Sequence, residues 1–266
     1  KQGKANNSKN GETDIIIKHA DIRRSLMNMK SLIEGQRSLA FWVSQQIDVS
    51  LNHPDKKIKT DADEIVALMT PLIKSFFTDI GMEITNDAIQ VFGGYGYTKD
   101  QGIEQLFRDN RITPIYEGTN SVQAIDLVYR KILNNKIFEK YIAQLSNEVK
   151  EFAKDNTLSL FADKFFKYLE LLNNFTLWLG EKNKSSKDDV SAACNDYLKV
   201  LGYIALAHSW LKILKVSHSK LKENKTFYED KINTAKYYFE KILPRVQSYY
   251  LSAITGSETM MKSNFN

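Results

Sequence analysis

The stretch that decides the fold is residues 20–47, ADIRRSLMNMKSLIEGQRSLAFWVSQQI. Its apolar side chains recur at steps of three and four, with one step of seven, which places them on one face of an amphipathic α-helix. A helix of this kind buries its apolar face against other elements, so the stretch predicts part of a helix bundle. The predicted apolar face consists of Ile22, Leu26, Met29, Ile33, Ala40, Val43 and Ile47.

Similar spacing continues along the chain. A second helix is predicted to begin at an N-cap, Asp61, and to run to Val91. Pro71 interrupts this pattern, which indicates either a kink or a helix start near Thr70. Further amphipathic helices are predicted over 136–155, 157–180, 187–222 and 226–254, with loops at 180–187 and 222–226.

The composition favours the same fold class. The chain has 266 residues, of which 42% are hydrophobic and 26% charged, values typical of globular proteins. Its 4 prolines and 12 glycines are too few for the many turns of a β-sandwich or barrel. The single cysteine, Cys194, excludes a disulfide framework and a cysteine-rich zinc site, and a reducing compartment fits best. His208 and His218 are too far apart for one helical turn, so no metal is implied. We predict an all-α protein.

The charge pattern argues against nucleic acid. The net charge is +5, and residues 1–134 carry 17 basic and 17 acidic side chains, so the whole excess lies in the second half. There the lysines are scattered through helical patterns, as on a solvated surface. No run approaches the roughly 18 apolar residues of a membrane span. The polar loop 1–14 contains no apolar targeting segment, so we expect a soluble protein without a leader.

The block 90–123 reads QVFGGYGYTKDQGIEQLFRDNRITPIYEGTNSVQ. It interleaves glycines, aromatics and charges, a departure from bundle composition that is typical of functional sites. Gly93, Gly94 and Gly96 allow the main chain to approach a flat or phosphorylated ligand. No strand precedes them and the spacing is not GxGxxG, so a Rossmann phosphate loop is not supported.

Three parts of this block, QVFGGYGYTKD, RDNRI and IYEGTN, resemble in order and spacing the carboxy-terminal signature of the acyl-CoA dehydrogenases. Residues 15–40, IIIKHADIRRSLMNMKSLIEGQRSLA, resemble the second helix of that family's four-helix domain. Residues 136–266 look like the additional helical module of the branch that includes the methylmercaptopropionyl-CoA dehydrogenases. The resemblance implies a polar loop at 1–14, an acyl-CoA dehydrogenase C-terminal helix bundle at 15–135 without its first helix, and a second helical domain at 136–266.

The family resemblance also implies a reaction. These enzymes use FAD to oxidise an acyl-CoA thioester to 2-enoyl-CoA, and Glu117 falls on the position of the catalytic base that removes the α-proton. The backbone N–H of Glu117 would donate to the developing enolate, and Gly118 would keep that backbone accessible. Tyr116 would line the acyl pocket. A carboxylate in this role needs burial in an apolar pocket to raise its pKa.

The cofactor positions follow from the same resemblance. In the family, the stretch that matches residues 90–94 reaches across a dimer interface to the adenosine diphosphate part of the neighbouring subunit's FAD, and Thr119 and the residue two beyond it contact the local flavin. This chain has Ser121 at that second position, where the family usually has a longer Glu or Gln. The predicted FAD-binding residues are Gln90, Val91, Gly93, Gly94, Thr119 and Ser121.

Structural roles compete with the functional ones. Taken alone, Glu117 would be a carboxylate favoured by a helix start. Asp109 and Arg111 are expected to form an ion-pair and capping set rather than to act in catalysis. Cys194 is expected to be a small buried side chain. Core or interface positions are predicted for the aromatics Phe76, Phe77, Phe92, Tyr95 and Tyr97, and packing anchors for Trp178 and Trp210.

In the family, an amino-terminal helical domain and a middle β-domain precede this region. We therefore expect this chain to be a fragment, inactive without those domains. Expected partners are an acyl-CoA substrate, a homodimer or dimer of dimers, a separate amino-terminal half, and an electron-transfer flavoprotein, in the cytoplasm. An uncovered apolar stripe where the first bundle helix is missing would favour self-association. The alternative interpretation is a non-catalytic helical scaffold that retains the motif.

Overall fold

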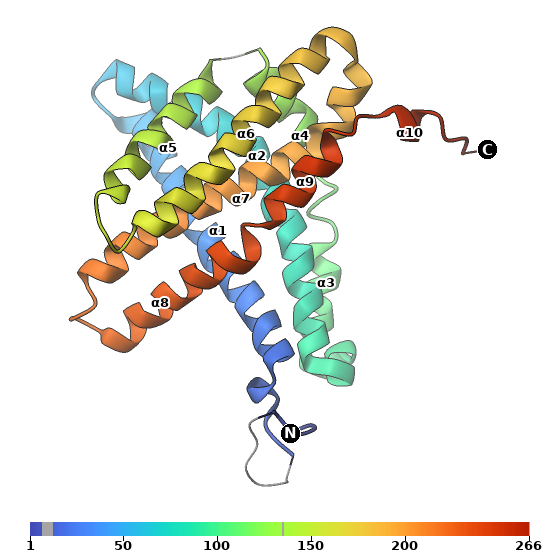
Figure 1. Cartoon of the computed structure of the whole chain (residues 1–266). Helices are drawn as coiled ribbons and strands as arrows, with labels where there is room; N and C mark the ends of the chain where they lie inside the picture. The colour runs from blue at the N-terminus through green and yellow to red at the C-terminus, as the bar shows by residue number, and fades with distance from the viewer. Residues whose placement is uncertain (7–12, 135, 266) are drawn as a thin grey trace.

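The computed structural model describes residues 1–6, 13–134 and 136–265, and within them every regular element is a helix (Figure 1). This confirms the predicted all-α fold class. The α-helices are α1 (Ala20–Asn52), α2 (Lys56–Phe92), α3 (Ile103–Asn110), α4 (Asn120–Asp126), α5 (Ile137–Ala153), α6 (Ser159–Ser185), α7 (Lys187–Ser219), α8 (Lys225–Tyr237), α9 (Arg245–Ala253) and α10 (Glu258–Met261). Single π-helical segments extend α4 and α8: η4 (Leu127–Ile132) and η5 (Tyr238–Ile242).

The helices α1 and α2 form a hairpin across residues 53–55. Asp55 caps α2, because its Oδ1 accepts hydrogen bonds from the backbone N–H groups of Lys57 at 2.7 Å and Ile58 at 3.1 Å. The predicted N-cap at Asp61 is therefore wrong. The first turn of α2 is exposed, so the apolar pattern begins only after the helix has already started.

Pro71 lies inside α2 and is buried. Of the two alternatives for this residue, a helix start near Thr70 is wrong, because α2 is continuous from Lys56 to Phe92. The proline ring supplies no N–H to the carbonyl one turn earlier. Just before it, the hydroxyl of Thr70 donates to the carbonyl of Val66 at 2.8 Å. The residues around the proline are anchored in the core, since Met69 and Leu72 are both buried there.

The buried face of α1 differs from the predicted one. Ile33 and Ile47 are 39% and 41% exposed. The indole Nε1 of Trp210 donates to the carbonyl of Ser31 at 3.1 Å, and a Cβ at Gly35 would lie 2.9 Å from the same nitrogen. Small residues thus let a bulky side chain from another helix lie against α1, which apolar spacing alone does not indicate. The buried residues of α1 are Asn28, Ser31, Leu32, Gly35, Leu39 and Val43.

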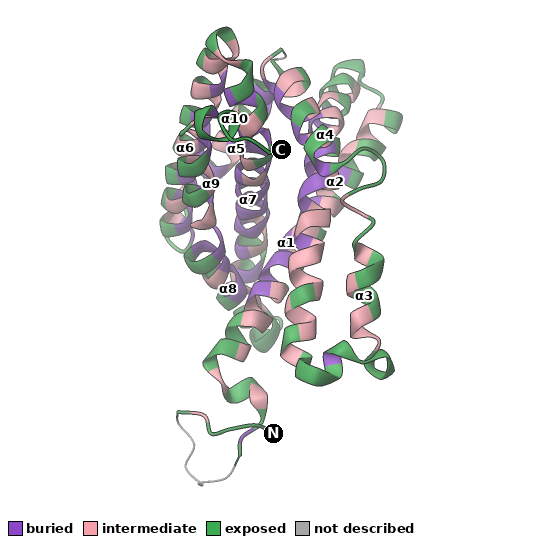
Figure 2. Cartoon of the chain, turned by 90° about the vertical axis from the view of Figure 1, so that its right-hand side faces the viewer, coloured by how far each residue is buried: buried purple, intermediate pink, exposed green. Residues whose placement is uncertain are grey.

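Helix α7 forms the centre of the molecule, with α1, α2, α4, α5, α6, α8 and α9 packed around it (Figure 2). Its residues 197–211 have side chains that are almost all buried. The predicted loop at 180–187 is wrong: α6 runs to Ser185, and the hydroxyl of Ser186 caps α7 by accepting from the N–H of Asp189 at 3.3 Å. Serines and lysines at a helix end mimic a loop composition. The predicted single helix over 226–254 is likewise divided, by η5 and Pro244.

One continuous hydrophobic cluster extends from Leu32 in α1 to Ala253 in α9. Residues of 136–266 therefore share a core with the hairpin of α1 and α2. The predicted packing anchor Trp210 is fully buried, whereas Trp178 is only partly buried, against Phe175.

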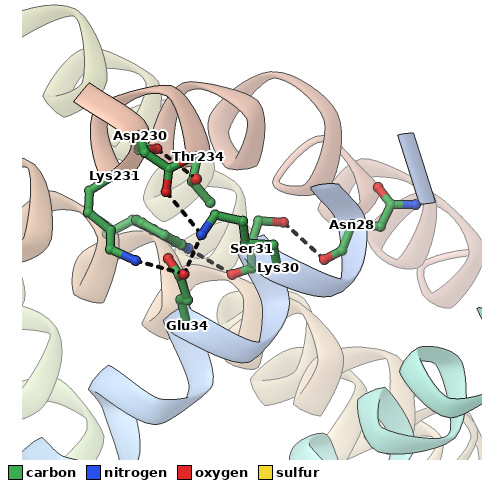
Figure 3. A network of polar contacts seen from close by, with 8 residues as sticks. Asn28, Lys30, Ser31, Glu34, Asp230, Lys231 and Thr234 are labelled. Atoms are coloured by element: carbon green, nitrogen blue, oxygen red, sulfur yellow. Dashed lines mark hydrogen bonds and ion pairs between the residues drawn. The ribbon is translucent and has the colours of Figure 1, made fainter. Parts of the chain in front are cut away.

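A polar network links α8 to α1 (Figure 3). The ammonium of Lys30 lies 2.7 Å from Glu34 on its own helix and 3.0 Å from Asp230 on α8. Lys231 contacts the same oxygen of Glu34 at 2.7 Å. Charged groups that bridge two helices in this way fix their relative register more than they add stability.

The helical segment Lys56–Tyr97 is long and apolar enough to cross a membrane, in contrast to the expectation from uninterrupted apolar runs. This is a weak indication, because a core helix meets the same criterion, and Leu68, Leu72 and Phe76 of α2 are buried in the core. Among the described residues, no cluster of three or more His, Cys, Asp or Glu side chains could hold a metal ion.

Candidate functional site

The block 90–123 begins in the last turn of α2, reverses direction, and then runs back beside that helix. After α2 ends, the short helices η2 (Gly93–Tyr97) and η3 (Lys99–Gln101) turn the chain, and α3 runs back beside α2 (Figure 2). The Asn110 side chain packs on α2 at Gly81, where a Cβ would lie 3.0 Å from Nδ2 of Asn110. The segment 111–119 and the start of α4 therefore lie beside the middle of α2.

Glu117 has a left-handed backbone conformation. Its φ is 55°, the only positive φ of a non-glycine residue in the described part of the chain, and Gly118 follows with a φ of 81°. A side chain in this region costs about 1–2 kcal/mol, a cost that glycine avoids. Strain of this kind concentrates at functional sites. The predicted base and the predicted glycine thus form one strained turn.

Hydrogen bonds from two helices hold this turn. Nε2 of Gln123, on α4, donates to the carbonyl of Glu117 at 2.9 Å. Nζ of Lys74, on α2, donates to the carbonyl of Gly118 at 2.7 Å and to Oδ1 of Asn120 at 2.9 Å. The backbone N–H of Asn120 donates to the carbonyl of Pro114 at 3.0 Å, which closes the loop.

The two flavin-side residues at the start of α4 already take part in the fold. The hydroxyl of Thr119 caps α4 by accepting from the N–H of Val122 at 3.4 Å. The hydroxyl of Ser121 accepts from Nδ2 of Asn195, on α7, at 3.3 Å. Because each hydroxyl acts as an acceptor in its bond, each can still donate its hydrogen to a ligand.

The predicted base lies on an open apolar surface. Glu117 is exposed, and among the described residues its carboxylate forms no hydrogen bond or ion pair. Tyr116 is 48% exposed beside it. The described residues therefore do not close the apolar pocket that the predicted chemistry requires. Further exposed apolar side chains in this segment and on α4 are Ile112, Ile115, Val122 and Ile125.

The remaining predicted cofactor residues lie elsewhere. Gln90 and Val91 are in the last turn of α2, some 15 residues beyond Ser75, which contacts the start of α4. At 1.5 Å per residue, this separates the two groups by about 22 Å along the helix. One copy of the chain therefore does not bring the two groups together.

The three glycines that follow α2, at positions 93, 94 and 96, differ in whether the fold itself requires glycine there. Gly93 has a φ of 62°. At Gly96 a Cβ would lie 2.6 Å from the carbonyl oxygen of Ile89, so the chain's own packing requires glycine. Gly94 has neither reason, because a Cβ at this position would meet no atom within 4 Å. The backbone at 93–94 is open, as a surface for a flat or phosphorylated ligand requires.

The predicted structural roles of α3, Cys194 and the aromatic side chains are confirmed only in part. The ion pair of α3 joins Arg108 to Glu104, not Asp109 to Arg111, because residues four apart share a helix face. Asp109 accepts a hydrogen bond from Gln105 at 3.3 Å instead. Cys194 is buried as predicted, which raises the pKa of its thiol to about 12. Phe76 belongs to the core and Phe77 packs against it, whereas Phe92, Tyr95 and Tyr97 are exposed.

Sequence reasoning missed Lys74 and Asn120. Asn120 is buried, and it lies inside the block 90–123. A polar amide next to the predicted Glu117 turn could therefore have been considered as a residue that holds the turn. Lys74 lies 44 residues before Gly118, in a chain with many other lysines, so no local pattern marked it.

Comparison with known proteins identifies both halves of the chain. Residues 5–133 match the family described as acyl-CoA dehydrogenase, C-terminal domain, and residues 145–264 match the family described as acetyl-CoA dehydrogenase C-terminal like. The 3-methylmercaptopropionyl-CoA dehydrogenase of Ruegeria pomeroyi is 38% identical over 120 residues, which are 45% of this chain and 20% of that protein. A butyryl-CoA dehydrogenase of Syntrophomonas wolfei is 28% identical over 242 residues, 87% of this chain and 39% of that protein.

Solved structures agree in fold. Acyl-CoA dehydrogenase complexed with FAD, from Bacillus anthracis, superposes with a TM-score of 0.68 at 14% identity, over 93% of this chain and 46% of that one. Caenorhabditis elegans ACDH-11 in complex with C11-CoA gives a TM-score of 0.67 at 19% identity, over 91% and 40%. The chain thus spans less than half the length of these relatives. Two adjoining family matches, relatives of the same kind and a shared fold lead to one conclusion: the chain belongs to the acyl-CoA dehydrogenase family.

Proposed function

We propose that this chain is the carboxy-terminal part of an FAD-dependent acyl-CoA dehydrogenase, in which Glu117 removes the α-proton of an acyl-CoA thioester. The observation that carries the proposal is the strained turn at Glu117 and Gly118, held from two helices and facing an open apolar surface. A catalytic carboxylate must be fixed relative to its substrate, and a rigid turn on a packed helix does this.

The roles of the chain's residues follow from their positions. Glu117 accepts the α-proton, and the electron pair of the broken C–H bond forms the new double bond. Its backbone N–H makes no hydrogen bond within the described residues, so it can donate to the thioester oxygen as negative charge develops. Tyr116, half-exposed at the same turn, lines the acyl chain. A bound flavin supplies the acceptor for the hydride that leaves the β-carbon.

The FAD is held by two groups of residues. Thr119 and Ser121 contact the flavin side through hydroxyl hydrogens that are available for donation. Gln90 and Val91, in the last turn of α2, and the open backbone at Gly93 and Gly94 would hold the adenosine diphosphate of a second subunit's FAD. The separation of the two groups along α2 supports a homodimer, or a pair of dimers, as the working assembly.

Closure of the site requires further protein. The exposed apolar side chains around Tyr116 are typical of a surface that another domain covers. We propose that the domains that precede this region in the family cover it, exclude water and raise the pKa of the base by burial. The chain alone is then inactive. An electron-transfer flavoprotein as the final electron acceptor and a cytoplasmic location complete the proposal.

The test combines the chain with those domains. The chain is assembled with the amino-terminal and middle domains of the Ruegeria pomeroyi relative and with FAD, and reduction of the flavin by acyl-CoA is followed by absorbance. Glu117→Gln keeps the shape of the side chain but cannot take the proton, so turnover should fall by about 10⁴-fold, the upper end for a general base.

Glu104→Gln is the matched control, because Glu104 is a carboxylate of the same block that pairs with Arg108 on the helix surface. It should retain turnover and flavin absorbance. Turnover of Glu117→Gln within a few-fold of the parent would place the base elsewhere. A chain that binds no flavin in any assembly would instead favour the non-catalytic scaffold.

A further inference from the structure

We propose that Lys74 is a positioning residue for Glu117, acting through the Gly118 carbonyl and the Asn120 amide. The inference rests on the proposed role of Glu117 as the base and adds to it a residue that sets the direction of that base. Lys74 belongs to α2, outside the signature block, and its ammonium reaches the turn from that neighbouring helix.

The contacts of Lys74 are directed at the turn. Its Nζ lies 2.7 Å from the Gly118 carbonyl oxygen and 2.9 Å from Oδ1 of Asn120. Within the described residues it forms no ion pair, so its charge acts on these two neutral oxygens. A hydrogen bond from a charged donor is shorter and stronger than a neutral one. Lys74 therefore connects the strained turn to α2 through two hydrogen bonds from a charged donor.

Asn120 extends the same connection. Its side chain is buried, and Nδ2 donates to Oδ1 of Asp79 at 2.6 Å, to the hydroxyl of Thr78 at 2.9 Å and to the carbonyl of Ser75 at 3.2 Å. One amide thus links the Lys74 ammonium to the Asp79 carboxylate. Both ends of the amide have partners on α2, which fixes its orientation and the first turn of α4.

The two carbonyls around Gly118 are held from opposite sides. Gln123 of α4 binds the Glu117 carbonyl, and Lys74 of α2 binds the Gly118 carbonyl. These bonds hold the 117–118 and 118–119 peptide planes, and so restrain the carbonyl side of Glu117, the residue with the strained φ. The Cα of Glu117, which carries the side chain, is attached to the first of these planes, so the direction of the carboxylate depends on them. Removing Lys74 releases one of the two.

The first experiment measures the turn in the chain itself. Amide exchange by mass spectrometry is compared for the parent, Lys74→Met and Lys59→Met. Lys59 is the matched control, because it also lies on α2 and also donates to a backbone carbonyl, that of Leu51 at 2.9 Å. In Lys74→Met, exchange should accelerate at least tenfold in peptides covering 114–123 and stay unchanged in α1 and α7. Lys59→Met should leave 114–123 unchanged.

The second experiment measures catalysis in the FAD-loaded assembly described above. Lys74→Met should lower kcat by about 10²-fold, the effect of a small misplacement of a catalytic group, with KM and flavin absorbance little changed. In a Glu117→Gln background the same substitution should cause no further loss, because a positioning residue acts only through the group it directs. A merely structural role would lower activity in both backgrounds.

Chemical rescue covers the case in which Lys74→Met fails to fold. Lys74→Cys, alkylated with 2-bromoethylamine on the purified chain, restores an ammonium at nearly the original reach, and Cys194 is buried and stays unmodified. Recovery of kcat and of slow exchange at 114–123 is the expected result. Unchanged kcat and unchanged exchange in the uncharged variants would overturn the proposal while leaving Glu117 as the base. Full turnover of Glu117→Gln would overturn the base instead, and the exchange data would still decide whether Lys74 holds the turn.

Discussion

Gly202→Ala should destabilise the protein although alanine is the better helix former. Gly202 lies in α7, where a Cβ would be 2.5 Å from two ring carbons of Phe76 and 2.8 Å from a third. Phe76 is 1% exposed and stands edge-on to the ring of Tyr203, at 5.0 Å between centroids, so it has no space to retreat into. The methyl group must push α7 and α2 apart.

The magnitude follows from two opposing effects. Replacing a glycine inside a helix by alanine gains about 1 kcal/mol. Overpacking a dense core costs about 1–3 kcal/mol, and the upper end applies here because the overlap of nearly 1 Å falls on a rigid ring. The net loss is then about 2 kcal/mol, which for a chain of this size lowers the Tm by about 4–8 °C.

Thermal and urea unfolding, followed by circular dichroism, measure whether Gly202→Ala lowers or raises the stability. Gly180→Ala is the control, since Gly180 is also inside a helix, α6, and a Cβ there meets nothing within 4 Å. Gly180→Ala should raise the Tm, and Gly202→Ala combined with Phe76→Leu should recover most of the loss. If Gly202→Ala unfolds at or above the parent temperature, α7 and α2 do not approach each other as closely as this reasoning requires.

Two further predictions concern ionisable groups of α7. Burial lowers the pKa of His208, and the hydrogen bond from its Nε2 lowers the pKa of Glu148 to about 2. The unfolded chain therefore binds more protons than the folded chain. The free energy of unfolding should then fall by up to about 1.4 kcal/mol per pH unit as the pH drops below 6.5. A His208→Gln variant should lose this pH dependence, which urea titrations between pH 7 and 5 would measure. Asp189 accepts from Ser257 at 2.6 and 2.8 Å, so Asp189→Asn should expose the segment after 256 to proteolysis, whereas Asp188→Asn should not.

The sequence predicted the helices better than their faces. Spacing of apolar residues is a local property, so it located α1 and most of α7. The buried stripe of α1 includes Ser31 and Gly35 because Trp210, far away in the chain, needs small neighbours. A periodicity argument counts only apolar side chains and cannot anticipate a partner of this kind. The helix at 180–185 was missed for a related reason, since its lysines and serines face solvent.

In the candidate site, too, local sequence features could be predicted and contacts between distant residues could not. Glu117, Gly118 and Thr119 were predicted through a family resemblance that one short motif, IYEGTN, carries in consecutive residues. Lys74 was not, since its link to Gly118 spans 44 residues and exists only once α3 has brought the chain back along α2. The exposure of Glu117 is likewise a property of the folded surface, which the order of residues in the motif does not indicate.

Helix α7 connects the second half of the chain to the site. Gly202 lies against Phe76, which directly follows Lys74 and Ser75, two of the α2 residues that bond to the turn or to Asn120. Seven residues earlier on α7, Asn195 donates to Ser121 at 3.3 Å. A displacement of α7 therefore reaches both sides of the turn through direct contacts. Gly202→Ala should then accelerate amide exchange at 114–123 more than its loss of global stability requires, and Gly180→Ala should not. Equal acceleration throughout the chain would mean that α7 supports the fold without reaching the turn.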